Sequence, residues 1–224
     1  MKLVRILGLA SALGLGITAW LVFYWAPLEQ AMGFVQKIMY IHVPSVLVCY
    51  LAFFISFLAS VGYLWKRTEG YDVVALCSAE IGVIFCGITL VTGAIWGKPT
   101  WNTYWTWDAR LTTTLILFLI FVGYLLLRRF VEFSEQQARF AAIIAIIGFL
   151  DIPLIHQAVT WWRTLHQTST LFSMKPGGAI DDPLKWMLYV AMVAFYLFFA
   201  YLLTKRIQLE RQERELRRTL AALE

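Results

Sequence analysis

The chain has 224 residues, of which 60% are apolar, 16% aromatic and only 15% charged, and its formal net charge is +5. Because an average soluble domain is about 25% charged and about 45–50% apolar, this composition excludes an ordinary soluble domain and indicates a membrane protein. We expect no nucleic-acid partner, since the basic residues follow the loops between apolar runs. Three cysteines lie inside those runs without CxxC or CxxCH spacing, which predicts small buried thiols at Cys49, Cys77 and Cys86.

Six apolar runs are long enough to cross a bilayer as helices, which takes about 20 residues. In chain order they cover residues 6–25, 43–65, 73–96, 111–130, 139–158 and 184–204. The first is longer than the roughly 7–15 apolar residues of a signal peptide, and no small-x-small cleavage site follows it. The sequence therefore predicts an all-α polytopic membrane protein with one six-helix domain over residues 1–204.

Residues 205–224 follow the sixth run and alternate charges with leucines at helical spacing. This pattern predicts a short amphipathic cytoplasmic helix that lies in solvent or on the membrane surface. Binding of a specific partner is the alternative.

The basic residues give the orientation, because Lys and Arg are enriched in cytoplasmic segments. With the N-terminus inside, 13 of the 19 Lys and Arg residues fall in inner segments and 6 in outer segments. We therefore expect both termini in the cytoplasm.

One outer segment is unusually aromatic. The stretch WGKPTWNTYWTWDARLTT, residues 96–113, lies between the third and fourth spans. Eight of the ten tryptophans fall in outer segments or at outer helix ends. An interfacial tryptophan belt should serve both membrane surfaces, so this asymmetry indicates a binding role for the aromatic segment, at about 96–110.

All three histidines are on the same predicted side. His42 lies in MYIHVPS, just before Pro44, and we expect this proline to hold it at the mouth of the second span. His156 lies in DIPLIHQ after Pro153, which should kink or end the fifth span. His166 lies further along the loop in WWRTLHQ.

Haem accounts for this combination better than zinc does. Iron accepts two axial imidazoles, and aromatic rings stack on a large apolar macrocycle. Zinc remains open if His166 and Asp108 join the other two histidines, but it leaves the tryptophans unexplained. Basic residues of the outer segments are candidates to bind the haem propionates: Arg110, Lys98 and Arg163.

Three stretches, WGKPTWNTYWTWDARLTT, MYIHVPS and DIPLIHQAVTWWRTLHQ, resemble motifs of the haem exporter protein C (CcmC) family of bacterial cytochrome c maturation. This family belongs to the haem-handling WWD superfamily. The resemblance covers nearly the whole chain and implies a multi-pass protein of the bacterial inner membrane whose functional face is periplasmic. It implies that His42 and His156 are the axial ligands of a haem b bound transiently and without covalent attachment. The implied aromatic platform runs from Trp96 to Asp108 and includes Trp101, Trp105 and Trp107.

The resemblance also implies partners besides membrane lipid. Members of the family present haem to the periplasmic chaperone CcmE and work beside CcmD and the transporter subunits CcmA and CcmB. We therefore expect a haem-transfer subunit rather than an enzyme in its own right, although assistance to covalent attachment on the chaperone stays open. Two rival readings are a membrane haem oxidoreductase, which needs histidines deep in the spans, and a small-molecule permease, which often shows internal repeats.

Two further acidic residues, Glu80 and Asp151, are candidates for a role. Glu80 lies inside the third span, where an ionisable side chain is costly, and we expect it to face the bundle or a neighbouring subunit, with protonation a possibility. Asp151 is close in sequence to His156 and is a candidate to orient that imidazole by accepting a hydrogen bond from it.

Overall fold

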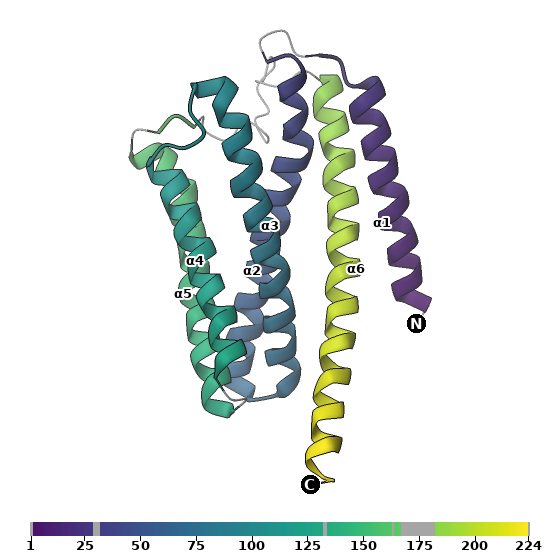
Figure 1. Ribbon diagram of the computed structural model, residues 1–224, viewed down its shortest axis with the longest axis vertical. Coiled ribbons are helices and arrows are strands. Elements are labelled where there is room, and N and C mark those ends of the chain that lie inside the picture. The colour runs from purple at the N-terminus through teal and green to yellow at the C-terminus, as the bar shows by residue number, and fades with distance from the viewer. Residues whose placement is uncertain (1, 29–31, 132–133, 163, 167–181, 224) are drawn as a thin grey trace.

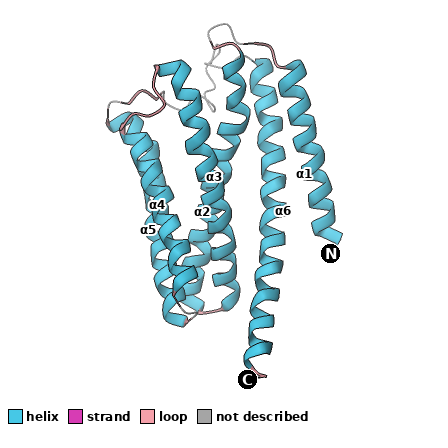
Figure 2. Ribbon diagram, viewed as in Figure 1, coloured by secondary structure: helices cyan, strands magenta, loops and turns pink. Residues whose placement is uncertain are grey.

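The computed structural model describes residues 2–28, 32–131, 134–162, 164–166 and 182–223. Within these ranges the chain forms six helices that are long and apolar enough to cross a membrane, and no strand (Figure 1, Figure 2). They are α1 (Lys2–Trp20), α2 (Met39–Lys66), α3 (Glu69–Trp101), α4 (Ala109–Phe130), α5 (Glu135–Trp161) and α6 (Asp182–Ala221). A π-helical turn, Leu21–Trp25, follows α1, and a 3₁₀ turn, Phe34–Ile38, precedes α2. The predicted all-α fold with six spans is confirmed.

The helices divide into a group of four and an outer pair. Helices α2 to α5 pack on one another, α6 lies against α2 and α3, and α1 packs on α6 (Figure 1). A Cβ on Gly14 would lie 3.2 Å from Cβ of Ala194, so a small residue lets α1 approach α6 closely. The loops 102–108 and 164–166 lie at one end of the bundle, which we call the aromatic end, and both termini lie toward the opposite end.

The centre of the four-helix group is an aromatic stack that glycines make possible. Phe53 of α2 and Phe121 of α4 stack with ring centroids 3.7 Å apart, and both side chains are fully buried. A Cβ on Gly82 would lie 2.5 Å from Phe53, and one on Gly148 would lie 2.8 Å from Phe121. The glycines at positions 82 of α3 and 148 of α5 therefore leave room for the two rings in a closely packed interior.

Both prolines near the histidines lie inside helices. Helix α2 begins at Met39, so Pro44 is its sixth residue and His42 is helical. Helix α5 runs past Pro153 to Trp161, so of the two expected effects of this proline, a kink or an end of the span, the end is excluded. Each proline removes one helical hydrogen bond, and the helices nevertheless continue in a bundle that buries Tyr40 and Ile155.

Two other segments are more helical than predicted. Helix α3 continues through Trp96 to Trp101, so the first third of the aromatic segment is a helix end rather than a loop. Helix α6 runs without a break from the sixth span through the predicted tail helix to Ala221. The tail is helical as expected, but it is continuous with the span.

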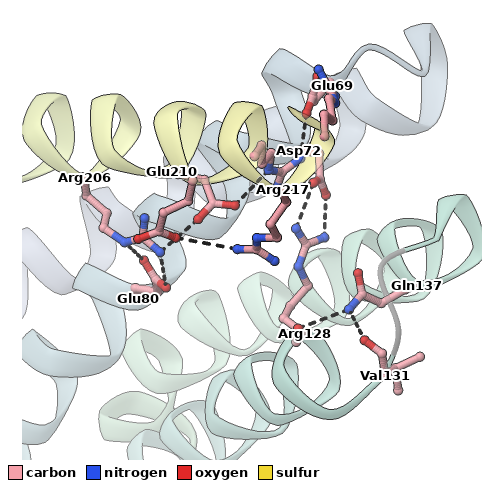
Figure 3. A network of polar contacts seen from close by, with 12 residues as sticks. Glu69, Asp72, Glu80, Arg128, Val131, Gln137, Arg206, Glu210 and Arg217 are labelled. Carbon is pink, nitrogen blue, oxygen red and sulfur yellow. Dashed lines mark hydrogen bonds and ion pairs between the residues drawn. The ribbon is translucent and has the colours of Figure 1, made fainter. Parts of the chain in front are cut away.

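An ion-pair network fastens this extension of α6 to the bundle (Figure 3). Asp72 of α3 is 4% exposed and accepts a two-pronged contact from Arg128 of α4, at 2.5 and 2.8 Å. Arg214 of α6 donates to the same carboxylate at 2.8 Å and to Glu210 at 2.8 Å. Paired, hydrogen-bonded charges of this kind are the form in which ions are tolerated in an interior.

The charged face of the extension, rather than its leucines, points toward the bundle. Arg206, Glu210 and Arg214 follow one another at four-residue spacing and therefore share one helix face. Leu209 and Leu216 are exposed on the other side. The sequence predicted a helix in solvent or on the membrane surface, whereas Glu210 and Arg214 are buried against the bundle.

Glu80 also belongs to this network. Its carboxylate lies 2.7 Å from Nε and 3.0 Å from Nη2 of Arg206, which also contacts Glu210 at 3.0 Å (Figure 3). Glu80 therefore faces the bundle, as expected.

Candidate functional site

The aromatic segment consists of a helix end, a short loop and a helix start. Asn102 adopts the left-handed conformation, with φ of 58°, and ends α3. Lys98 donates to the carbonyl oxygen of Asn102 at 3.0 Å and lies over the ring of Tyr104. The structure therefore places Lys98, a candidate for propionate binding, at the end of α3 as part of its cap. Arg163, another candidate, lies outside the described residues.

Asp108 connects three parts of this end. One carboxylate oxygen accepts from the backbone N–H of Leu111 at 2.9 Å and caps the N-terminus of α4. The other lies 3.2 Å from Nδ1 of His166 and accepts from the Thr106 hydroxyl at 3.4 Å. Beside these groups is an open cavity of about 360 Å³ lined by Thr106, Asp108, Thr164 and Leu165.

His166 is a residue that the sequence analysis left without a role. Its ring packs edge-on against Trp101, with centroids 4.7 Å apart, and contacts Asp108. Burial and the nearby charge of Arg110 hold the pKa of His166 below its ordinary value, while Asp108 opposes that shift. The pairing of Asp108 with a residue 58 positions later has no local sequence signal.

Replacing Asp108 by Asn tests this arrangement. Asparagine caps a helix as well as aspartate does, so α4 should stay intact while the negative charge beside His166 is lost. The pKa of His166 should then fall further, because the group that opposes the shift has been removed. An NMR titration of the His166 ring measures this directly, with Glu213→Gln at the opposite end as control. An unchanged or higher pKa in Asp108→Asn would contradict the assignment.

His42 lies on α2 and faces one turn of α3. Its Nδ1 is 3.0 Å from the hydroxyl oxygen of Thr92, and its ring meets Trp96 edge-on with centroids 5.7 Å apart. A Cβ on Gly93 would lie 3.1 Å from Cε1 of the imidazole. The ring is therefore enclosed by Thr92, Gly93 and Trp96, and Thr92 and Gly93 are contacts that the sequence analysis did not identify.

His156 lies on α5 and is more exposed than His42. Its Nδ1 is 3.3 Å from the carbonyl oxygen of Ile152 in its own helix, and its ring lies against Tyr50 of α2, with centroids 5.3 Å apart. The expectation that Asp151 orients this imidazole is wrong, because Ile152 supplies the acceptor. One buried oxygen of Asp151 has no hydrogen-bond partner among the described residues.

The two histidines belong to neighbouring helices at the aromatic end, but their rings contact different partners. Helices α2 and α5 pack together, and Tyr50, beside His156, lies two turns after His42, or about 12 Å along α2. Arg110, in the first turn of α4, is close enough to His42, Tyr50 and His166 for its charge to act on all three. The structure thus brings His42, Arg110 and the His166–Asp108 pair to one region, with His156 adjacent to it.

The tryptophans of the segment have different surroundings. Trp96 and Trp101 pack on the histidine rings, whereas Trp105 and Trp107 pack edge-on against each other with centroids 5.6 Å apart. Trp107 is 76% exposed. The indole N–H groups of Trp96 and Trp105 are buried without an acceptor among the described residues.

A zinc site is not favoured by the side chains that the structure describes. No group of three or more His, Cys, Asp and Glu residues lies close enough there to hold a metal ion, whereas zinc needs three or four such ligands. The three cysteines are buried thiols, as predicted.

Comparison with known proteins gives the family. The family model of CcmC, heme exporter protein C, matches residues 1–222. The heme exporter protein C of Bradyrhizobium diazoefficiens is 40% identical over 177 residues, covering 79% of this chain and 67% of the relative. That of Escherichia coli is 37% identical over 170 residues, covering 75% of this chain and 68% of the relative. That of Paracoccus denitrificans is 34% identical over 213 residues, covering 95% of this chain and 88% of the relative.

The family match spans the six apolar helices and all three histidine motifs. A multi-pass membrane protein with a role in haem handling for cytochrome c maturation follows from it. The chain belongs to the CcmC, heme exporter protein C, family.

Proposed function

We propose that this protein binds haem at its aromatic end, with His42 and His156 as axial ligands, and presents it to the chaperone CcmE. The observation that carries the proposal is that His42 lies with Arg110 and Trp96 at one end of the bundle, on a helix that packs against the helix of His156. The carbonyl of Ile152 can only accept a hydrogen bond, so Nδ1 of His156 carries a proton there and Nε2 has its lone pair available. Haem, as cargo, supplies an iron that accepts two imidazoles.

Other residues of the same end would hold the macrocycle. The exposed ring of Trp107, packed on Trp105, offers an aromatic surface to one face of a haem. The guanidinium of Arg110 is a bidentate donor for a propionate carboxylate, and the buried N–H groups of Trp96 and Trp105 are further donors that have no acceptor in the part of the chain that the structure describes. In this proposal the side chains bind and orient the cargo without any covalent bond.

The site is open, which suits transfer rather than storage. His156 and Trp107 are both exposed, so a second protein can reach the ligand and the aromatic surface without opening the bundle. The bias of basic residues toward the segments at the opposite end supports an inner-membrane protein with the aromatic end in the periplasm. We propose that it acts there in a complex with CcmD and the transporter subunits CcmA and CcmB.

The purified full-length protein in detergent provides the test. Titration with haem should give the absorption spectrum of an iron with two imidazole ligands, and addition of purified CcmE should transfer the haem to the chaperone. The proposal fails if haem binds without that spectrum, or if it binds but does not pass to CcmE.

Trp107→Ala should weaken haem binding about 2- to 10-fold, because an aromatic contact contributes about 0.5–1.5 kcal/mol beyond area burial. The affinity is measured by the same titration. Trp65→Ala is the matched control, since Trp65 is also exposed but lies at the far end of α2. Equal losses in both variants would mean that Trp107 acts only as a membrane-interface residue.

A further inference from the structure

The imidazole of His42 lies in a socket made by a single turn of α3. Thr92 contacts Nδ1 at 3.0 Å, Trp96 meets the ring edge-on, and Gly93 leaves space that a Cβ would fill. All three residues fall within five positions of one helix, so their relative placement is rigid. The ring is therefore fixed by α3 although it belongs to α2.

The hydrogen bonds of Thr92 decide which nitrogen of His42 carries the proton. The Thr92 hydroxyl donates to the carbonyl oxygen of Ile88 at 2.7 Å, with the carbonyl of Thr89 as a second acceptor at 3.3 Å. A hydroxyl has only one proton, and neither carbonyl can return one. With this proton directed to Ile88, the oxygen of Thr92 accepts toward His42, which makes Nδ1 of His42 the donor.

We propose that Thr92 is a positioning residue that holds His42 in the tautomer with Nδ1 protonated and so directs the lone pair of Nε2 to the haem iron. The role toward iron rests on the proposed function, whereas the tautomer follows from the hydrogen bonds alone. A hydrogen bond from the second ring nitrogen raises the basicity of a ligating imidazole and fixes its orientation. Thr92 thus makes His42 a stronger and better-aligned ligand than a free histidine at a helix end.

The two proposed ligands are consequently unequal. Both have an acceptor at Nδ1, but the acceptor of His42 is a side chain of another helix and that of His156 is the backbone of its own helix. His42 is enclosed, whereas His156 is exposed and contacts Tyr50. A substitution at position 92 can therefore alter one ligand and leave the other unchanged.

The tautomer is tested on the haem-free wild-type protein with its three histidines labelled with ¹⁵N. We expect the chemical shifts of His42 to report a neutral ring protonated at Nδ1. A ring protonated at Nε2 instead would overturn the proposal. This measurement needs no variant and does not depend on haem.

The role of Thr92 toward iron is tested by Thr92→Val, which keeps the side-chain shape and removes the acceptor. Haem affinity should fall about 10-fold, the lower range for loss of an outer partner of a metal ligand, and the haem midpoint potential should become more positive because the imidazole donates less strongly. Thr92→Ser should restore both values. The control is Thr89→Val one turn away, whose hydroxyl donates to Phe85 of its own helix.

Unchanged affinity and potential in Thr92→Val, or equal changes in Thr89→Val, would overturn the positioning role. A failure of the proposed function would look different. In that case His42→Ala would have the same haem spectrum as the wild-type protein. The NMR measurement on the haem-free protein would still decide the tautomer.

Discussion

Replacing either proposed axial ligand should abolish the spectrum of haem held by two imidazoles. In His42→Ala and His156→Ala the iron would lose one of its two imidazole ligands. Haem affinity should fall by more than about 100-fold, because the loss of even an outer partner of a metal ligand typically costs about 10- to 100-fold. Loading of CcmE should stop in both variants. Absorption spectroscopy of the purified proteins and a chaperone-loading assay give the two measurements.

His166→Ala is the matched control, because His166 lies at the same end but is paired with Asp108. It should keep the wild-type spectrum. Added imidazole should restore the spectrum of His156→Ala more readily than that of His42→Ala, because His156 is exposed whereas the His42 ring is enclosed by α3. Wild-type spectra in both ligand variants would remove the assignment.

Replacing Asp72 by Ala should cause the largest loss of stability. This carboxylate is the common acceptor of Arg128 and Arg214, whose side chains are 5% and 8% exposed. Its removal would leave two buried guanidinium groups without their shared partner, and breaking a buried pair typically costs about 3–5 kcal/mol. For a chain of this length the melting temperature should fall on the order of 10 °C.

The experiment compares the melting temperatures of detergent-purified Asp72→Ala and Glu213→Ala. Glu213 pairs with Arg217 at 3.6 Å, and both side chains are more than half exposed. Removing such a surface pair should change stability by no more than about 1 kcal/mol. Equal shifts in the two variants would show that the buried network does not hold α6 in place.

The spans and the end that carries the site could be predicted because both depend on patterns local in the sequence. Six apolar runs are enough to identify six helices, and the histidines and tryptophans lie at the ends of those runs. The helix limits were less accurate. Rules for proline describe an isolated helix, whereas these helices pack in a bundle that buries Tyr40 and Ile155.

The surroundings of the histidines could not be predicted, because they come from contacts between distant segments. His42 meets Thr92 across 50 residues, and His166 meets Asp108 across 58. The orientation of the α6 extension depends in the same way on Asp72 and Arg128, which lie in other helices. A stripe that alternates charges with leucines is amphipathic whichever face is buried, so its pattern alone does not identify the inward side.

The ion-pair network has a consequence for how the protein meets lipid headgroups. Its members are four arginines and four carboxylates: Arg128, Arg206, Arg214, Arg218, Glu69, Asp72, Glu80 and Glu210. Because these charges cancel, the whole +5 of the chain is carried by residues outside the network. Attraction to an anionic leaflet is therefore left to exposed residues at that end, such as Lys66, Arg67 and Arg129.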